Sequence, residues 1–385
     1  MHEVVIVGIG QTPVGEHWQL SLQNLAAQAI RKVIADSGGL RPQVLYVGNF
    51  LASAASHQAN LGALLSGDVG LNGIEAVSVG AGEASGAAAL RMGYLAVRSG
   101  FVDVAMVVGV EKLTDNIQRD MNALASQSCD YDFEVMQGLT PAGQAAMLMN
   151  RYMQQYHIAR GVFAEFPIIA HSNAVYNPNA MYRRKIDREM YEKAPLVCEP
   201  LNLLDIAPYA DGAAALIITR RELIKTNGVH PLIEIAGLGL ATDNLALHER
   251  TDILAFDAVG ISTRTALRAA GVPLAQIDFF ECWDAFSIYP MLSLEAAGFA
   301  SRGEGCMLSS RGALRLEGEL PINTMGGLKA RGYPLGAGGV YQIVDAVTQL
   351  RGKAGENQVE NARIGLVQTL GGPAATAVTY VLRRL

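Results

Sequence analysis

Hydrophobic residues recur along this chain in two kinds of block that alternate with one another. Compact runs rich in valine and isoleucine are typical of strands covered on both faces. Longer segments repeat their apolar positions every three to four residues, as an amphipathic helix does. In the first half the strand-like runs are 4–7, 44–49, 74–79, 102–108 and 211–219, and the helical segments are 20–36, 60–66 and 83–99. This alternation predicts βαβ units and a mainly parallel sheet.

The second half repeats the pattern. Its strand-like runs are 232–240, 277–281, 363–368 and 376–382, and its helical segments are 259–270, 285–297 and 340–350. Two similar halves predict a pseudo-symmetric α/β protein with five layers, αβαβα, which we divide into residues 1–225 and 226–385. The segment from about 114 to 203 departs from the pattern, because it is more polar and rich in methionine and tyrosine. We interpret it as an inserted loop domain that shapes a substrate site.

Composition and charge narrow the classes of function. The 385 residues are 50% hydrophobic, and the net charge of −6 is spread without a Lys/Arg cluster, which argues against a nucleic-acid partner. No apolar run reaches the roughly 20 residues of a membrane span, and no secretory signal opens the chain. We therefore expect a soluble, cytoplasmic protein. The four cysteines lie far apart without C-x-x-C spacing, so neither a zinc site nor a disulfide framework is indicated.

The glycine-rich stretch 322–339 is the most informative part of the chain. Glycines surround Tyr333 and lead directly into the helical segment 340–350. Glycine lets backbone and ligand approach closely, and the N–H groups at the start of the following helix would point at whatever occupies the loop. A loop before a helix is also a common structural turn, so the motif gains its meaning from the rest of the sequence.

Several motifs, in this order, resemble those of the thiolase superfamily over nearly the whole chain. They are Gly109-Val-Glu-Lys, Gly138-Leu-Thr-Pro, Asn177-Pro-Asn-Ala, Asp211-Gly-Ala-Ala-Ala, Glu281-Cys-Trp-Asp-Ala-Phe, Asn323-Thr-Met-Gly-Gly, Gly332-Tyr-Pro-Leu-Gly-Ala-Gly-Gly and Gly371-Gly372. The nearest resemblance is to archaeal and bacterial thiolases related to the sterol carrier protein-X type. It implies a thiolase fold, in which two βαβαβαββ halves form a five-layer αβαβα sandwich with an inserted loop domain.

The resemblance also implies that the thiolase catalytic residues are replaced. Glu83, in Glu83-Ala-Ser-Gly86, holds the place of the nucleophilic cysteine, and Tyr333 holds that of the G-H-P histidine. Trp283 stands at the histidine of the H-D-x-F motif, and Thr369 at the second cysteine. A thiolate attacks a carbonyl carbon well near neutral pH, whereas a carboxylate would give a reactive anhydride. We therefore do not expect acyl transfer through an acyl-cysteine.

Two readings stay open for each candidate site residue. Tyr333 is either a general base or acid, with a phenol of lowered pKa beside a CoA thioester, or an aromatic plug in a dead site. Glu83 is a proton shuttle or a cap for the helix that follows it. Trp283 stacks on substrate or fills the space of the lost histidine, and Asp284 orients a neighbour or is simply a satisfied polar residue. His57 lies near the site or on the surface.

The candidate groups for coenzyme A are glycines. Gly371 and Gly372 resemble the family's oxyanion-hole and pantetheine-contact glycines, and Gly332 and Gly336 frame Tyr333. Coenzyme A is expected only as part of the substrate, with no tightly bound cofactor and no metal.

A branch of the superfamily, the lipid-transfer-protein-type aldolases, also lacks the cysteine and has tyrosine in the G-H-P place. These enzymes cleave branched β-hydroxyacyl-CoA thioesters by a retro-aldol reaction and work with a small OB-fold, zinc-ribbon partner. We expect the same chemistry in lipid or steroid catabolism. The alternatives are a silent acyl-CoA-binding or scaffold subunit, and an acetyl-CoA acetyltransferase. The resemblance further implies a homodimer formed through the strand at 74–79, although a buried internal strand would have the same composition.

Overall fold

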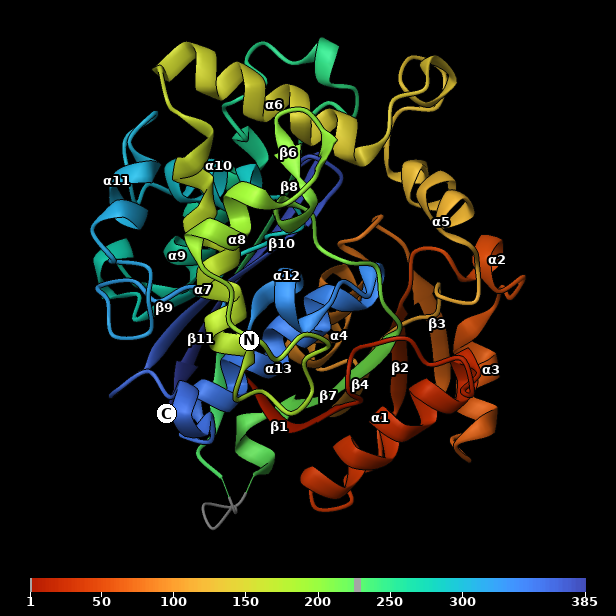
Figure 1. The fold of residues 1–385 in the computed structure, drawn as a ribbon. Helices are drawn as coiled ribbons and strands as arrows, with labels where there is room; N and C mark the ends of the chain where they lie inside the picture. Colours follow the sequence, from red (N-terminus) through yellow and green to blue (C-terminus); the bar gives the residue numbers. More distant parts are fainter. Residues whose placement is uncertain (1, 225–229) are drawn as a thin grey trace.

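The computed structural model describes residues 2–224 and 230–385, so the domain boundary expected at residues 225 and 226 lies outside the described residues. Nine strands form one sheet in the order β3-β2-β4-β7-β1-β8-β11-β10-β9 (Figure 1). These strands are β1 (Val4–Gln11), β2 (Val44–Gly48), β3 (Glu75–Val79), β4 (Val104–Glu111), β7 (Gly212–Arg220), β8 (Ile233–Thr242), β9 (Phe279–Glu281), β10 (Ile364–Gly371) and β11 (Thr376–Arg384). β5 (Leu196–Cys198) and β6 (Leu201–Asn202) form a separate two-stranded sheet.

Helices alternate with these strands as the apolar periodicity predicts. They are α1 (Leu22–Asp36), α2 (Ala52–Ala55), α3 (Leu61–Asp68), α4 (Ser85–Ser99), α5 (Gln118–Ala125), α6 (Pro141–Tyr156), α7 (Glu165–Ala174), α8 (Arg188–Lys193), α9 (Asp257–Ala270), α10 (Ile288–Ala297), α11 (Gly305–Ser310), α12 (Gly327–Arg331) and α13 (Gly338–Leu350). Among the described residues, no helix combines the length and the apolar character needed to cross a membrane.

The strand order confirms the two pseudo-symmetric halves. Read outward from the β1–β8 junction, the order is the same in both directions: β1, β7, β4 and β2 of the first half correspond to β8, β11, β10 and β9 of the second. Where the first half continues with β3, the described part of the second half has a parallel bridge between Phe280 and Ile322 in place of a further strand. The halves meet where β1 pairs with β8, so their strands form one continuous sheet.

The prediction of a mainly parallel sheet was wrong. β2 pairs in parallel with β3 and β4, and β9 pairs in parallel with β10. All the other neighbours in the large sheet are antiparallel. Helical crossovers give the parallel pairs, but a tight turn joins β10 to β11, and such a turn can only produce an antiparallel pair. The alternation of apolar blocks does not record strand direction.

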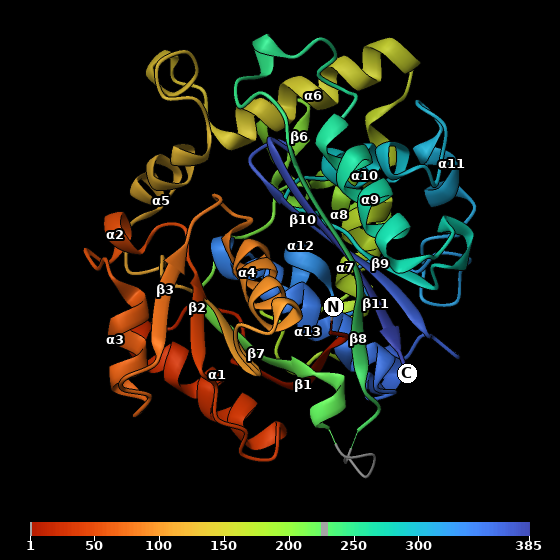
Figure 2. The ribbon, with the colours of Figure 1, turned by 180° about the vertical axis from the view of Figure 1, so that it is seen from behind.

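The helices produce the expected five layers (Figure 2). α1 and α3 pack on the outer face of the first half, where Leu25 and Leu65 meet strand residues such as Val108. α9 and α10 cover the outer face of the second half. α4 and α13 lie in the middle layer, and Leu90 and Val340 belong to the same buried cluster. The two central helices begin close together: a Cβ on Gly86 would lie 2.7 Å from the carbonyl oxygen of Gly336.

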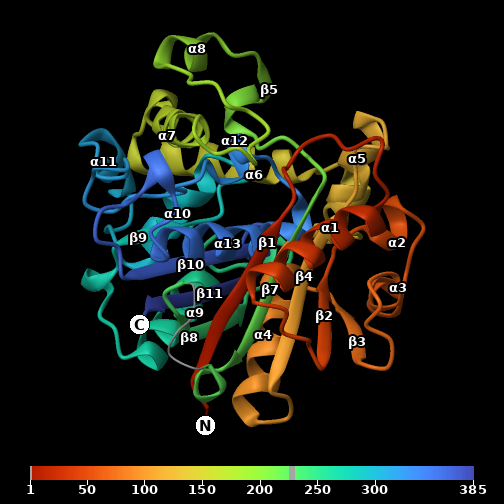
Figure 3. The same ribbon diagram turned by 90° about the horizontal axis from the view of Figure 1, so that it is seen from below.

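Residues 112–211, all described, run from β4 to β7 without adding a strand to the large sheet. They contain α5 to α8 and the small β5–β6 sheet. α6 packs against α10, and α7 packs against α12, so this segment of the first half extends over the second (Figure 3). It thereby covers the region where α4 and α13 begin.

Candidate functional site

Glu83 lies in the turn between β3 and α4, and its side chain is only 5% exposed. The turn is closed locally, because the hydroxyl of Ser85 accepts from the N–H of Ala81 and donates to the carbonyl of Gly82. The carboxylate of Glu83 reaches across to the other half and accepts from the N–H of Gly372 at 2.8 Å. α4 itself starts at Ser85, with no side-chain hydrogen bond at its N-cap residue, Ala84. The capping interpretation of Glu83 is therefore not what the structure shows.

Tyr333 precedes α13 and is also 5% exposed. Its backbone pairs with the segment before β7: its N–H donates to Pro208, and its carbonyl accepts from Ala210. The ring lies 5.8 Å from that of Tyr209 and 5.6 Å from that of Trp283, measured between centroids. Tyr333 is thus fixed by its backbone and by an aromatic ring from each half of the chain.

Glu83 and Tyr333 lie close enough that each shifts the pKa of the other. Burial raises the pKa of Glu83, while the N–H of Gly372 and hydrogen bonds with the Ser128 and Tyr333 side chains act in the opposite direction. Burial, followed by the charge of Glu83, raises the pKa of Tyr333 well above its ordinary value. The expected phenol of lowered pKa is therefore wrong, because a dry site beside a carboxylate favours the neutral phenol.

Four side chains near Glu83 were missed in the sequence: Ser128, Cys129, Tyr209 and Tyr289. Burial, followed by the charge of Glu83, raises the pKa of Tyr209. Burial, followed by the charges of Cys129 and Glu83, raises the pKa of Tyr289 well above its ordinary value. The sequence offered no signal for them, since Cys129 is isolated and the tyrosines fall outside the motif positions that the resemblance assigns. They come from the inserted segment, from the entry to β7 and from α10.

Cys129 lies close enough to Glu83 for their charges to interact, but this thiol is not activated. It is 4% exposed, and its Sγ donates to Oε1 of Gln144 at 3.3 Å. Burial and the charges of Glu83 and Glu134 raise its pKa to about 12. A thiol in this state is protonated at neutral pH and is a poor nucleophile.

Trp283 and Asp284 are both 1% exposed. The indole lies so close to α13 that a Cβ on Gly338 would come within 2.7 Å of it, so Trp283 fills space. Oδ1 of Asp284 accepts from the N–H of Leu328 at 2.7 Å, which anchors the start of α12. Its Oδ2 has no partner among the described residues, and burial raises the pKa of this carboxyl.

The other candidates, His57, Gly332 and Gly336, do not belong to the cluster around Glu83. His57 is exposed, in the left-handed region at φ 51°, between α2 and α3. Gly332, at φ +110°, faces Val14, and a Cβ there would lie 2.6 Å from that side chain. Gly336 donates its N–H to Glu111, and its Cα packs against the backbone of Phe50. Both glycines thus meet packing requirements of the fold.

Gly371 and Gly372, by contrast, lie at Glu83. A Cβ on Gly371 would be 2.8 Å from the carbonyl of Ala81, in the turn that carries Glu83. Gly372, at φ +58°, supplies the N–H that Glu83 accepts. Thr369, two residues before Gly371, donates to Gln342 at 2.8 Å inside the core.

Two of the resemblance motifs form the frame around this site. The carboxylate of Glu111 accepts from Asn49, Phe50, Leu51 and Gly336 and so joins the ends of β2 and β4 to the loop before α13. Burial raises its pKa to about 7. Asp211 binds Lys112 at 2.9 Å and the backbone of residues 113 and 114. These contacts hold together the elements that surround the site.

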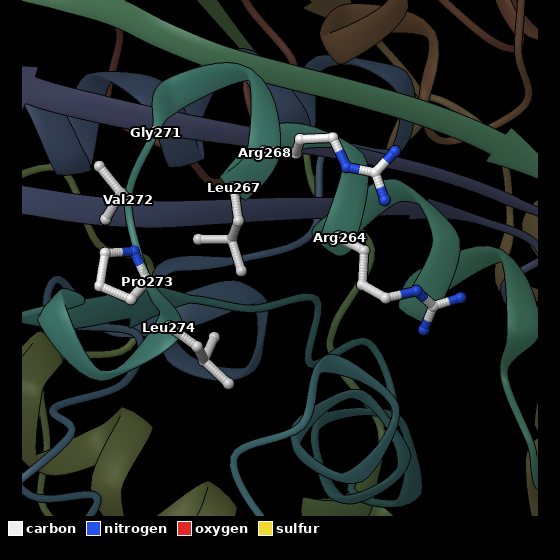
Figure 4. A pocket seen from close by; sticks show the side chains of 7 residues that line it. All are labelled: Arg264, Leu267, Arg268, Gly271, Val272, Pro273 and Leu274. Atoms are coloured by element: carbon white, nitrogen blue, oxygen red, sulfur yellow. The ribbon is translucent and has the colours of Figure 1, made fainter.

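Figure 4 shows a pocket of about 450 Å³ on a different part of the molecule. It lies at the C-terminal end of α9 and is lined by Arg264, Leu267, Arg268, Gly271, Val272, Pro273 and Leu274. None of these residues contributes to the cluster around Glu83. Within residues 2–224 and 230–385, no group of three or more His, Cys, Asp or Glu side chains is arranged to hold a metal ion.

Comparison with known proteins agrees with this architecture. The chain is 37% identical over 386 aligned residues to an acetyl-CoA acetyltransferase of Methanothermobacter thermautotrophicus, with 100% of both chains covered. It is 28% identical to sterol carrier protein 2 of Gallus gallus, covering 98% of this chain and 71% of that protein. A solved structure described as Ltp2-ChsH2(DUF35) aldolase superposes with a TM-score of 0.85 at 25% identity, covering 99% of this chain and 98% of that one.

Domain families give the same result for both halves. Residues 4–222 match the thiolase N-terminal domain, and residues 239–384 match the family described as thiolase C-terminal domain-like. With the pseudo-symmetric strand order and the paired central helices, these matches show that the chain belongs to the thiolase superfamily.

Proposed function

We propose that this protein cleaves a carbon–carbon bond of a branched β-hydroxyacyl-CoA by retro-aldol chemistry, without an acyl-cysteine. The observation that carries the proposal is the buried carboxylate of Glu83, which accepts from the N–H of Gly372 and shifts the pKa of Tyr333. The resemblance puts Glu83 and Tyr333 in the places of the thiolase cysteine and histidine, so a proton-transfer pair stands where a nucleophile and its base would be. The similarity to a structure named as an aldolase supports the same chemistry.

The raised pKa of Tyr333 decides how the proton moves. A neutral phenol cannot serve as a standing base, but it can relay a proton. The oxygen of Tyr333 takes the proton of the substrate β-hydroxyl while its own proton passes to the carboxylate of Glu83. The electron pair of the O–H bond forms the new carbonyl, the Cα–Cβ bond breaks, and its electrons pass into the thioester enolate.

The same proton completes the reaction. It returns from Glu83 to Cα of the enolate and gives a ketone and a shortened acyl-CoA, so no net proton is gained or lost. The helix N-terminus that follows Glu83 favours negative charge and would stabilise the enolate before it is protonated. The N–H of Gly372 is already engaged by Glu83, so its role in this scheme is to stabilise the ionised carboxylate.

Acetyl-CoA acetyltransferase activity is the function named for a relative at 37% identity. That chemistry needs an ionised thiol, and the buried thiols closest to the site do not provide one. Burial and Glu83 raise the pKa of Cys129 to about 12. Burial and Asp284 raise that of Cys282 well above its ordinary value. Both observations argue against acyl transfer through an acyl-cysteine.

A second candidate function is a silent subunit that binds acyl-CoA or serves as a scaffold. The burial of the candidate residues favours this function, because Glu83 and Tyr333 are each 5% exposed and Trp283 packs beside Tyr333. We keep it as the alternative that the experiment below separates from the lyase.

The proposed assembly is a homodimer, together with a small OB-fold partner. β3 lies at the edge of the sheet, so the strand at 74–79 is not the buried internal strand that its composition would also fit. Apolar side chains are exposed on it and on the neighbouring helix α4: Val77 at 43%, Met92 at 40% and Leu95 at 39%. A second copy that continues the sheet would cover this edge. The DUF35 partner in the name of the aldolase structure supports the search for a second chain.

The test is a mass-spectrometric assay with two substrates and the purified protein, with and without any co-encoded OB-fold chain. One reaction contains acetoacetyl-CoA and free CoA, and the other a branched β-hydroxyacyl-CoA. The proposal predicts ketone and shortened acyl-CoA in the second reaction only. Tyr333→Phe should abolish this cleavage, whereas Tyr176→Phe, at a tyrosine that is 53% exposed, should retain it.

The other outcomes lead to different conclusions. Thiolysis of acetoacetyl-CoA would show that the acetyltransferase reading is right. No turnover in either reaction, combined with a rise in melting temperature when the thioesters are added, would favour the silent subunit.

A further inference from the structure

Arg250 lies in the connection between β8 and α9, and its side chain is 2% exposed. Its Nε donates to the carbonyl of Asn244 at 2.9 Å, and its Nη1 donates to the carbonyl of Pro373 at 2.7 Å. The carboxylate of Asp243 lies 3.7 Å away. Nη2 has no partner among the described residues. The guanidinium is thus buried mainly against backbone carbonyls rather than in a close ion pair.

The carbonyl that Arg250 binds belongs to the turn between β10 and β11. Gly372, at φ +58°, and Ala374, at φ 60°, both adopt the left-handed region. For alanine this conformation is unfavourable, so the turn needs support from outside. Two hydrogen bonds from the β8–α9 connection give this support. Arg250 donates to the carbonyl of Pro373, and the N–H of Asp243 donates to the carbonyl of Ala375 at 2.9 Å.

We propose that Arg250 is a positioning residue for Glu83. By holding the carbonyl of Pro373, it fixes the turn so that the N–H of Gly372 points at the Glu83 carboxylate. This N–H lowers the pKa of Glu83 against the effect of burial. The inference rests on the proposed function, in which Glu83 accepts a proton and must therefore be ionised, and it extends that function to a residue that does not touch the reacting groups.

The surroundings of Glu83 make this N–H important. The side chains that face it from the inserted segment, the entry to β7, α10 and the loop before α13 are Ser128, Cys129, Tyr209, Tyr289 and Tyr333. All of them are neutral when protonated, and none carries a positive charge. The cation of Arg250 does reach Tyr289, whose pKa it lowers against the dominant effect of burial. Within this set the N–H of Gly372 is a principal stabiliser of the ionised carboxylate.

Removing a buried guanidinium costs stability in any protein, so the test must separate positioning from folding. Arg250→Ala and Arg250→Lys are compared with Arg268→Ala, which changes an arginine on the surface of α9. The protonation of Glu83 is followed by its carboxyl C=O infrared band, identified by its loss in Glu83→Gln. The pH profile of kcat/KM is measured in parallel, and free guanidinium is added to Arg250→Ala to restore the missing group.

Positioning predicts that Arg250→Ala raises the pH midpoint of the Glu83 band by about one unit, because a hydrogen bond to the ionised form is lost. The rising limb of the kcat/KM pH profile moves to higher pH by the same amount. On this limb kcat/KM therefore falls about tenfold at a given pH, and it recovers at higher pH. Arg250→Lys shifts it less, guanidinium reverses it, and Arg268→Ala leaves it unchanged.

An unchanged midpoint in folded Arg250→Ala or Arg250→Lys overturns the inference, even if activity falls evenly at every pH. The infrared reading does not need turnover. If the protein shows no carbon–carbon cleavage but the midpoint still moves, the proposed function fails and the positioning role stands.

Discussion

The N–H of Gly372 donates to Oε2 of Glu83 at 2.8 Å, across a separation of 289 residues. The bond joins the turn before α4 to the turn after β10, so each half of the chain supplies one partner. The ionisation of Glu83, in the first half of this thiolase fold, therefore depends on a backbone N–H from the second half. This dependence, and the electrostatic coupling of Glu83 to Tyr333, lead to predictions that experiment can separate.

Glu83→Gln should abolish proton acceptance while keeping the shape of the site. We expect kcat to fall by about 10²- to 10⁴-fold, the usual contribution of a positioned acid or base. Stabilisation of the fold by an added acyl-CoA should persist, and the melting temperature should not drop, because the amide avoids the cost of burying a charge. The exposed Glu317→Gln is the matched control. Activity close to wild type in Glu83→Gln would contradict the relay.

Cys129 should behave as an inert, buried thiol. Because its pKa is raised to about 12 and it is 4% exposed, iodoacetamide at pH 8 should modify the partly exposed Cys198 well before Cys129. Peptide mass spectrometry over a time course measures the order. Cys129→Ala should keep cleavage activity within a few-fold. An acyl group found on Cys129 after incubation with acyl-CoA would show that the protein uses a thiolase mechanism after all.

Gly332→Ala should destabilise the fold even though it adds only a methyl group. Gly332 has φ +110°, and the new Cβ would lie 2.6 Å from Val14. We expect a loss of about 2–4 kcal/mol in the free energy of unfolding, from backbone strain and overpacking together. Urea unfolding measures it. Gly15→Ala is the control, since among the described residues nothing lies within 4 Å of its added Cβ.

Because Lys329 is buried, its contribution to the free energy of unfolding should increase with pH in the alkaline range. Burial lowers its pKa to about 8 from 10.5, against the opposing charges of Asp284 and Asp205. Between these two values the unfolded chain binds more protons than the folded one, so this group's contribution to stability rises with pH over that window. Lys329→Met should remove up to roughly 3 kcal/mol of this rise between pH 8 and 10.5. Parallel slopes for the variant and the wild type in urea titrations would contradict the prediction.

Sequence patterns predicted the elements of this fold well, because the core is built from repeated apolar blocks. The five layers and the two halves follow from blocks that alternate in kind. Strand direction did not follow, since β7 and β11 have the same apolar composition whether they run parallel or antiparallel to their neighbours. The direct β1–β8 pairing across the halves also left no trace in composition.

The site was predicted only in part, for a similar reason. Glu83 and Tyr333 were found because each stands in a motif, and the structure brings them together. Tyr209 and Cys129 could not be found, since they reach the site through the path of the inserted segment. The pKa of Tyr333 was expected in the wrong direction, because burial and the charge of Glu83 are properties of the assembled site and not of a loop sequence.

The pairing of β1 with β8 has a consequence for how a substrate enters. Val5 and Ile6 pair in antiparallel register with Glu234 and Ile233 of the second half, so one sheet runs through both halves. A hinge between the halves would have to break this pairing, and the halves should therefore move as a rigid body. Access to Glu83 and Tyr333 then depends on displacement of the inserted segment around Ser128 and Cys129. Hydrogen exchange in that segment should be faster than in the sheet and should slow when an acyl-CoA binds.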